Sequence, residues 1–589
     1  MKYMHSAVLL ITLITSVIVC SQDTDYYQLA EKLRAQGCTA KAQLLYEQAL
    51  TINPHHLNAN FNLACLLFER HNFEEAVRYF NKTIELDPAC VQAHYNMGMC
   101  LKDLKKTGEA LLAFNKATDY CPTYTNAYLQ IGSILEEINK GDMAFGVYKK
   151  ILSFDTHCFM AHYRLGLLYR KLNQFDEAIT HLRTAVTLDY SQTMAIIELA
   201  NTLHLQDGSE KHSQECISLY TTALDRMPNN LGVLYNLGYT YKRLGCISQA
   251  LEIYNRVIAL SPDYATARFS RSLTYLALGD FEKGWQEYEW RWKTHPDNSK
   301  KFPHITVWDG TDLHGKTIIV YCEQGLGDTF QFIRFVPVLK NLGATVIVET
   351  QKPLKQLLSL CPYIDAVYAY GEKIPDCDYQ IPLMSLPRLL KTTLETISSD
   401  LPYIFAKPEY VEYWRDQLSA DTNFKIGICW QGNANYSTQA LRQVVALKSL
   451  NVKHFEPIMQ MDRVSVYNLQ MISGIDQISQ LSDPSLIKTF GKDFDESHGR
   501  FMDTLAVMKN MDLIITIDTS TCHAAGALKV PVWVLLPKPA DWRWMLDRND
   551  TPWYPTMRLF RQHTAGNWDE VIQDIVRELQ PLVSTKNIH

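Results

Sequence analysis

The stretch Leu57–Pro88, LNANFNLACLLFERHNFEEAVRYFNKTIELDP, is one copy of a pattern that recurs with a constant period along the first half of the chain. Its closing proline, Pro88, lies midway between two counterparts, Pro54 and Pro122. Self-similarity at a fixed period, here about 34 residues, indicates stacked copies of one supersecondary unit. In most copies an aromatic residue lies four positions after a small residue. The small residues keep the same phase at Ala42, Ala76, Ala110, Ala144, Ala178 and Ala250.

The repeated unit is expected to be a pair of helices. Small residues let the two helices approach closely, the aromatic residue fills the gap to the next pair, and proline ends the second helix because it cannot continue one. A four-residue insertion near residues 208–210 shifts the frame, after which Pro228, Pro262 and Pro296 follow at the same period. The pattern resembles the tetratricopeptide repeat. It predicts about eight repeats over residues 23–297, stacked as an α-solenoid with a concave surface.

One position in the first helix of several repeats carries a side-chain amide that is expected to face the concave surface. An amide both donates and accepts hydrogen bonds, so a row of amides can hold an extended peptide without reading its sequence. Polar residues that simply face solvent would give the same pattern. The row resembles the asparagine ladder of O-GlcNAc transferase, a solenoid fused to a sugar-transfer domain. Its members are Asn62, Asn96, Gln130 and Asn236.

The period changes after a turn-rich linker at residues 298–314. Short apolar runs then alternate with helical segments, as expected of strands buried on both faces of parallel sheets with crossover helices. Two Rossmann-like α/β halves are predicted, at 315–410 and 411–589, the second with a C-terminal helix, and ligands should bind beyond the carboxyl ends of the strands. The runs are KTIIVY, ATVIVET and DAVYAY in the first half and KIGICW, VSVYNL, LIITID and VPVWVLL in the second.

Two motifs follow strands of these halves. In CEQGLGDT, residues 322–329, two glycines favour a tight strand-to-helix turn that presents Asp328 to a ligand. In DTSTCHAAGAL, residues 518–528, Asp518 or Thr519 is expected to cap a helix, and the free backbone N–H groups at its start suit a diphosphate. An ordinary capped helix without a ligand would have the same sequence.

Three stretches together resemble one known family. They are CEQGLGDTFQFIRFVPVL, DTSTCHAAGALKVPVWVLLPKPADWRWMLDRND and the junction GDFEKGWQEYEWRW, and they are similar to tetratricopeptide proteins with a heptosyltransferase-like glycosyltransferase domain. The resemblance implies the two-Rossmann GT-B fold, a nucleotide-sugar donor and inversion at the anomeric carbon. It implies neither a metal nor a cofactor.

The resemblance also assigns roles to single residues. Asp328 matches the acid that takes the proton of the acceptor hydroxyl, with Gly325 and Gly327 in the acceptor loop. The loop around Arg442 departs from the family. Where relatives have His, Asp and Ser, this chain has Tyr436, Gln439 and Gln443, so the titratable His and Asp are lost. The residues matched to donor binding are Trp430, Gly432, Arg442, Thr519, Ser520, Thr521, His523 and Arg543.

Two functions remain open from the sequence. The first is a metal-independent, inverting glycosyltransferase that acts on a protein or glycan hydroxyl recruited by the repeats. The second is a non-catalytic interaction scaffold with a degenerate transferase domain. A nucleic-acid partner is excluded, because the net charge is −6 and no run of Lys and Arg stands out.

The first 22 residues are a separate hydrophobic segment. Its apolar run, residues 6–20, has the length of a signal-peptide core and is short for a membrane span. If the run acts as a signal or anchor, the protein is membrane-associated or secretory. If it does not, the protein is cytoplasmic.

Overall fold

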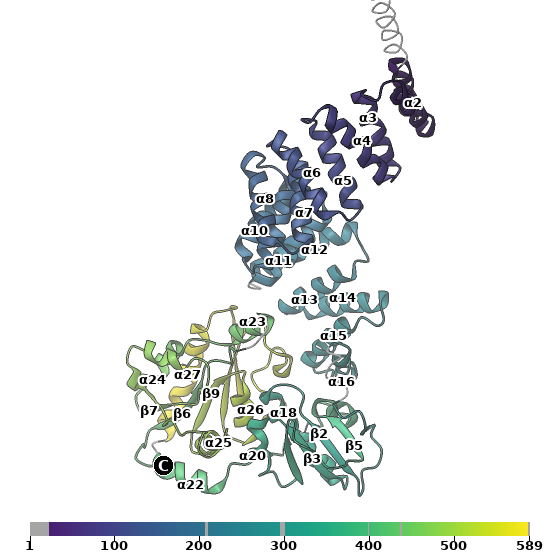
Figure 1. Cartoon of the computed structure of the whole chain (residues 1–589). Helices are drawn as coiled ribbons and strands as arrows, with labels where there is room; N and C mark the ends of the chain where they lie inside the picture. Colours follow the sequence, from purple (N-terminus) through teal and green to yellow (C-terminus); the bar gives the residue numbers. More distant parts are fainter. Residues whose placement is uncertain (1–22, 207–209, 295–300, 398–399, 436–438, 587–589) are drawn as a thin grey trace, which may run out of the picture. The chain divides into compact units, whose positions relative to one another are not determined.

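The structure is a computed structural model that describes residues 23–206, 210–294, 301–397, 400–435 and 439–586. Its internal contacts divide it into two compact units, residues 1–207 and 208–589, which are taken in turn (Figure 1). The hydrophobic segment expected at residues 1–22 lies outside the described residues. Among the helices in the described ranges, none has both the length and the apolar character needed to cross a membrane.

The first unit is a regular succession of helices, which confirms the tetratricopeptide period. The first helix of successive repeats starts at residues 57, 91, 125, 159 and 193, and the second at 73, 107, 141 and 175. In this unit Pro54, Pro88 and Pro122 each follow the end of a second helix, whereas Pro296 lies outside the described residues. The helices are residues 23–35, α2 (Thr39–Ile52), α3 (Leu57–Glu69), α4 (Phe73–Leu86), α5 (Val91–Asp103), α6 (Thr107–Tyr120), α7 (Thr125–Glu137), α8 (Gly141–Phe154), α9 (Phe159–Lys171), α10 (Phe175–Leu188) and α11 (Thr193–Gln206).

The small and aromatic positions of a repeat contact each other. A β-carbon built on Gly98 of α5 would lie 2.7 Å from the ring of Phe114 of α6. A β-carbon on Gly132 of α7 would lie 2.5 Å from the ring of Tyr148 of α8. Both rings are buried. Glycine therefore lets the two helices of one repeat close around the aromatic residue, which fills the gap within its own repeat.

Gly132→Ala is expected to destabilise the first unit, whereas Gly146→Ala is expected to stabilise it. The methyl group at position 132 collides with the buried Tyr148 ring, and overpacking of a core costs about 1–3 kcal/mol. Gly146 lies inside α8 with no atom within 4 Å of a built β-carbon, so alanine there gains about 0.5–1 kcal/mol of helix stability. Thermal unfolding followed by circular dichroism should show opposite shifts, and shifts of the same sign would contradict this packing.

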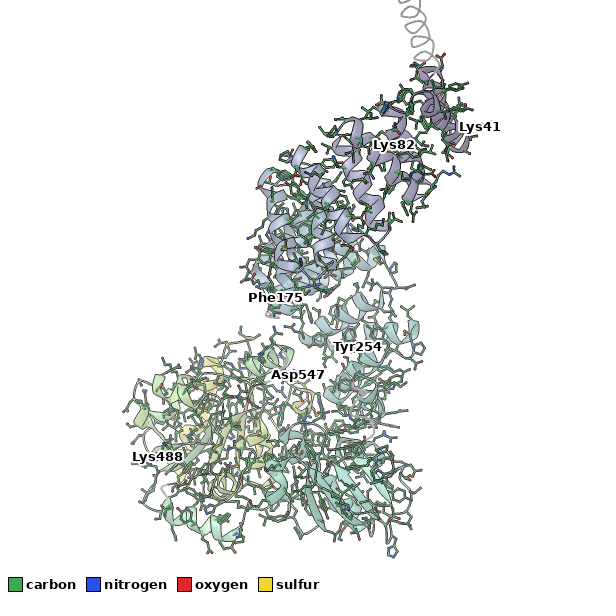
Figure 2. All side chains as sticks on the ribbon, in the orientation of Figure 1. Lys41, Lys82, Phe175, Tyr254, Lys488 and Asp547 are labelled. Carbon is green, nitrogen blue, oxygen red and sulfur yellow. The ribbon has the colours of Figure 1, made fainter. Side chains whose placement is uncertain are left out.

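The second unit begins with the remaining repeat helices. α11 starts at residue 193 and α13 at residue 231, so α13 starts later than the regular period would place it. α12, between them, is longer than the second helices of the other repeats. Both features confirm the insertion. A β-carbon on Gly238 of α13 would lie 2.9 Å from the ring of Tyr254 of α14, so the glycine–aromatic contact recurs here. Figure 2 labels Tyr254 among the side chains of this unit. The helices are α12 (Glu210–Arg226), α13 (Leu231–Arg243), α14 (Ile247–Leu260), α15 (Ala265–Leu278), α16 (Phe281–Tyr288) and α17 (Arg291–Thr294).

Two fully parallel sheets follow the repeats. The strand order is β1-β5-β2-β3-β4 in the first sheet and β11-β10-β9-β6-β7-β8 in the second. All seven predicted strands form, and β1, β5, β8 and β11 are added to them. The strands are β1 (Thr306–Val307), β2 (Thr317–Tyr321), β3 (Thr345–Thr350), β4 (Ala366–Ala369), β5 (Tyr379–Pro382), β6 (Phe424–Cys429), β7 (Val464–Asn468), β8 (Ile487–Lys488), β9 (Leu513–Ile517), β10 (Val532–Leu536) and β11 (Met557–Arg561).

The boundaries of the α/β part differ in detail from those expected. β1 lies in the segment expected to be a linker and pairs with β5, and α22 runs across the expected boundary at residue 410. The predicted C-terminal helix is α27. The helices are α18 (Leu326–Phe332), α19 (Val336–Asn341), α20 (Lys355–Leu358), α21 (Leu386–Leu389), α22 (Pro408–Gln417), α23 (Gln439–Lys448), α24 (Glu456–Met459), α25 (Met502–Met508), α26 (Ser520–Ala527) and α27 (Asp569–Lys586).

One hydrophobic core joins the last repeat helices to both sheets. The ring of Trp285 in α16 lies 5.5 Å from that of Trp542 and 5.8 Å from that of Phe332, measured between centroids. Phe281 stacks on Trp553 at 5.6 Å. Two of the stretches that carry the family resemblance, the repeat junction and the Asp-Trp-Arg-Trp segment, therefore pack against each other. The opposite face of the second sheet has a separate core under α27.

Candidate functional site

The CEQGLGDT stretch forms the turn between β2 and α18, and its acid caps that helix. Gly325 is the N-cap residue, and its N–H donates to the carboxylate of Asp328 at 2.8 Å. The backbone of Gly325 is extended, so its conformation does not by itself require glycine. The Asp328 side chain remains 21% exposed. The predicted base is thus held at the start of α18 and is still reachable from solvent.

Gly327 lies where α18 meets α26. A β-carbon on Gly327 would be 3.0 Å from the ring of His523 and 3.6 Å from the α-carbon of Ser520. Glycine here permits a close helix approach, a reason for the residue that the turn alone does not give. The loop expected to hold the acceptor and the segment expected to hold the donor phosphates are therefore in direct contact.

Arg543 connects α18 to the segment that follows β10. It lies in the 3-10 helix η8 (Trp542–Trp544), forms an ion pair with Asp328, and donates to Gln331 at 2.7 Å and to Asp541 at 2.9 Å. Burial alone would lower the pKa of Arg543, but the carboxylates of Asp541 and Asp328 outweigh it and raise that pKa. The Nε2 atom of Gln331 is buried without a hydrogen-bond partner among the described residues. This unsatisfied buried donor belongs to a residue that shares Arg543 with Asp328.

The DTSTCHAAGAL stretch forms the turn between β9 and α26. Thr519, one of the two predicted caps, is the N-cap residue, and its side chain accepts no capping hydrogen bond from the first turn. Ser520 begins the helix and Thr521 is 7% exposed. Because the first N–H groups of a helix lack intrahelical acceptors and carry the positive end of the helix dipole, an anion is favoured there.

His523 is a buried, neutral imidazole on α26. Its Nδ1 atom lies 3.0 Å from the hydroxyl of Tyr554, and its ring stacks on Trp544 with a centroid distance of 5.4 Å. Burial, followed by the positive charges of Arg543 and Lys448, lowers the pKa of His523 well below its usual value. The side chain can therefore exchange hydrogen bonds with a ligand, but it adds no charge.

Two lysines that the sequence did not single out interact with carboxylates of the second half, Lys448 with Asp518 of this segment and Lys242 with Asp541. Lys448, at the end of α23, has its ammonium 3.5 Å from the carboxylate of Asp518. Burial alone would lower the pKa of Lys448, but Asp518 and Asp541 raise it. Lys242, in the last turn of the repeat helix α13, has a pKa lowered to about 8 by burial, partly offset by attraction to Asp541. Both lysines are half-buried.

The Trp-Gln-Gly loop after β6 is held by hydrogen bonds within the second half. The backbone N–H of Trp430 donates to the Gln470 side chain at 3.1 Å, and that of Gly432 donates to Ser449 at 3.1 Å. Trp430 is fully buried. Arg442 is exposed on α23 and makes no hydrogen bond or ion pair with any residue the structure describes. On this helix it is Lys448, and not Arg442, that contacts the predicted phosphate segment.

Asp518, Cys522 and His523 offer a buried group of possible metal ligands, with ligand atoms within 4.8 Å of one another. The surroundings oppose a cation. The ammonium of Lys448 is 3.5 Å from Asp518, and the Cys522 thiol donates to the carbonyl of Thr519 at 2.9 Å. Burial also raises the pKa of Cys522 well above its usual value, so the thiol keeps its proton. The group fits an anion better than a metal ion.

The four predicted groove amides are all half-buried, three in the first unit and Asn236 in the second. In the first unit they bridge consecutive repeats. Asn62 donates to Glu31 at 2.7 Å, Asn96 lies 3.6 Å from the sulfur of Cys65, and Gln130 accepts from Lys102 at 3.1 Å. A peptide backbone would have to compete with these contacts.

Comparison with known proteins identifies the repeats. Family models described as tetratricopeptide repeats match residues 33–94, 91–124, 159–189 and 231–264. The protein FlbA of Caulobacter vibrioides is 24% identical over 392 residues, which make up 63% of this chain and 64% of FlbA. The chain thus spans just under two thirds of the length of that relative.

Solved structures of other repeat proteins are also similar. MamA from Desulfovibrio magneticus is 21% identical, covering 30% of this chain and 96% of its own, with a TM-score of 0.27. YrrB, described as a TPR protein with an unusual peptide-binding site, is 19% identical over 39% of this chain and 98% of its own, with a TM-score of 0.25. A repeat protein from Cytophaga hutchinsonii is 18% identical over 41% of this chain and 97% of its own, with a TM-score of 0.34. The family matches and the regular succession of helices show that the N-terminal part of this chain is a tetratricopeptide-repeat α-solenoid.

Proposed function

We propose that residues 315–589 form a glycosyltransferase of the two-lobed GT-B type. It would move a sugar from a nucleotide-sugar donor to a hydroxyl of a protein or glycan held by the repeats. The observation that supports this most is the close approach of α18 to the start of α26, where Gly327, next to Asp328, lies against Ser520 and His523. Sugar transfer needs a base for the acceptor proton beside a site for the departing diphosphate.

The proposed reaction is a single displacement. The acceptor oxygen attacks the anomeric carbon while its proton passes to Asp328, and the bond from that carbon to the diphosphate oxygen breaks with its electron pair. A carboxylate has about four lone-pair positions. Asp328 uses its bonds to Gly325 and Arg543 for two of them, which leaves room for an acceptor hydroxyl. Attack opposite the leaving group inverts the configuration.

Charge on the leaving diphosphate would be balanced by groups of the second half. The start of α26 supplies backbone N–H donors, Lys448 supplies a positive charge, and neutral His523 supplies a hydrogen bond. Lys242 would extend this positive region from the repeats. The donor is a substrate in this scheme, and no residue is assigned to a cofactor.

A protein-interaction scaffold is the second candidate function. Tetratricopeptide solenoids offer concave surfaces that bind peptides or proteins, and YrrB is described as having a peptide-binding site. One structural observation favours it. Asp328 caps α18 and forms an ion pair with Arg543, and a carboxylate with a purely structural role would make the same two interactions. Under this alternative the α/β part no longer transfers a sugar.

Replacing Lys448 with methionine tests the proposed phosphate site. Titration of inorganic diphosphate into the Lys448→Met variant should show affinity at least about tenfold weaker, because a contact to a charged group contributes about 1.5–3 kcal/mol. Arg442→Met, on the same helix but exposed, is the matched control and should bind as the unchanged protein does. Weakening by Arg442→Met alone would place the anion in the 433–443 loop and contradict the assignment.

A further inference from the structure

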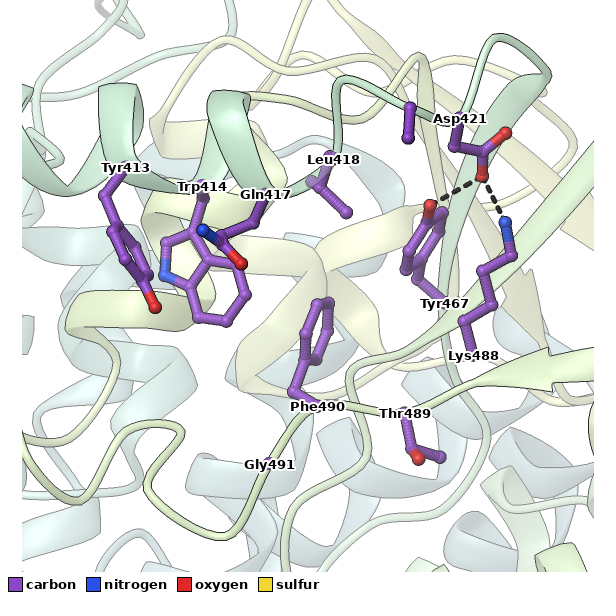
Figure 3. Close-up of a pocket in the computed structure, with 11 residues that line it drawn as sticks. Tyr413, Trp414, Gln417, Leu418, Asp421, Tyr467, Lys488, Thr489, Phe490 and Gly491 are labelled. Atoms are coloured by element: carbon purple, nitrogen blue, oxygen red, sulfur yellow. Dashed lines mark hydrogen bonds and ion pairs between the residues drawn. The ribbon is translucent and has the colours of Figure 1, made fainter.

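A pocket of about 630 Å³ opens at the edge of the second sheet, away from the residues discussed so far. It lies between the last turns of α22 and the segment that follows β8 (Figure 3). β8 is the edge strand of this sheet, whereas the predicted donor residues follow β6 and β9 in its middle. The pocket is within the size range of small-molecule sites.

One side of the pocket is aromatic and held in place. Phe490 stacks on Phe494 with ring centroids 4.4 Å apart, and Trp414 meets Phe490 edge-on at 5.0 Å. The indole N–H of Trp414 already donates to Asp503 at 2.8 Å, so this residue offers the pocket its ring rather than a donor. Tyr413, beside it, is 48% exposed. An exposed aromatic ring next to fixed ones provides an apolar plate for a flat ligand.

The other side is polar but carries little free charge. Asp421 accepts from Tyr467 at 2.6 Å and forms an ion pair with Lys488 (Figure 3). Burial alone would raise the pKa of Asp421, but the hydrogen bonds from Lys488 and Tyr467 lower it, so the pair is ionised and its charges cancel. The exposed side chains of Gln417 and Thr489 have no hydrogen-bond partners among the described residues.

We propose that this pocket binds an uncharged sugar ring, such as a terminal hexose of a glycan, at a second site distinct from the transfer site. A pyranose has an apolar face that suits the exposed Tyr413 ring and a rim of hydroxyls that suits Gln417 and Thr489. A phosphate is disfavoured because the cation of the pocket is already paired with Asp421. The proposal does not depend on the transfer reaction, since binding alone is assigned here.

The test is saturation-transfer NMR on the full chain with three probes, the methyl glycosides of glucose, galactose and N-acetylglucosamine. At least one should bind, and Tyr413→Ala should weaken that binding by about three- to tenfold through loss of the aromatic contact. Gln417→Leu should weaken it without touching the rings. Tyr190→Ala is the matched control, because Tyr190 is another exposed tyrosine, 53% exposed, on the repeats.

Added uridine diphosphate should leave the glycoside signal unchanged, which separates this pocket from the proposed donor site. The proposal is overturned if no glycoside binds to the folded protein, or if Tyr413→Ala binds as well as the Tyr190→Ala control. It is also overturned if glucose 6-phosphate binds more tightly than the uncharged glycosides.

Discussion

Arg543→Ala is expected to lower the free energy of unfolding of the second unit by about 3 kcal/mol, because breaking a buried ion pair by removing one partner costs about 3–5 kcal/mol. The change leaves Asp328 and Asp541 without their shared positive charge and leaves Gln331 without its donor. The lower end of the range applies because Asp328 and Asp541 keep 21% and 36% of their side-chain exposure.

Urea unfolding followed by tryptophan emission measures this loss in the intact chain. All 11 tryptophans lie at position 285 or later, so the signal reports on the second unit alone. Arg558→Ala is the matched control, because Arg558 pairs with Glu578 at 2.8 Å and both side chains are 42% exposed. The control should lose less than about 1 kcal/mol. Equal losses in the two variants would mean that Arg543 does not connect the halves as described.

Asp328→Asn is expected to reduce sugar transfer by about 100- to 10,000-fold, the range that a positioned general base contributes. Asparagine can still accept the hydrogen bond from Gly325, but it cannot take a proton from an acceptor hydroxyl. The affinity for the donor nucleotide should change little, because Asp328 is not assigned to the phosphates. Transfer is measured with the sugar derivative of whichever nucleoside diphosphate binds, using glycoprotein extracts as acceptor.

Asp541→Asn is the control that separates chemistry from stability. Like Asp328→Asn, it removes a carboxylate partner of Arg543, so the two variants should lose similar amounts of unfolding free energy. Its effect on transfer should be much smaller, because the Asp541 side chain is not placed to receive the acceptor proton. Similar transfer rates in the two variants would remove the reason to regard Asp328 as the base and would favour the scaffold.

The solenoid and most strands could be predicted because their signals are local. The prolines and the small and aromatic positions recur in most repeats, and they mark helices that pack against their neighbours in the chain. The strands that were missed are short or lie at sheet edges. β1 and β8 have two residues each, β5 has four, and β11 is an edge strand with polar residues at Arg558 and Arg561. Such segments carry too little apolar sequence to be recognised as strands.

The contacts within the candidate site could not be predicted because they join residues far apart in the chain. Arg543 and Asp328 are separated by 215 positions, and no local pattern marks them as a pair. Lys448 lies outside every motif, and its contact with Asp518 depends on how α23 packs against the turn after β9. The sequence pointed to Arg442 on the same helix, whose side chain is exposed in the structure. A motif gives the chemistry of a residue, whereas the packing of helices decides which residue reaches the site.

The proposed function requires that the second half hold a nucleoside diphosphate at the start of α26. Isothermal titration of UDP, GDP and ADP into the full chain tests it most directly, with the double variant Thr519→Ala/His523→Ala as control and tryptophan emission to confirm that the variant is folded. We expect saturable binding of one of these nucleotides and its loss in the variant. Absence of binding by all three, or equal binding to the folded variant, would contradict it and leave the repeats as the functional part of the protein.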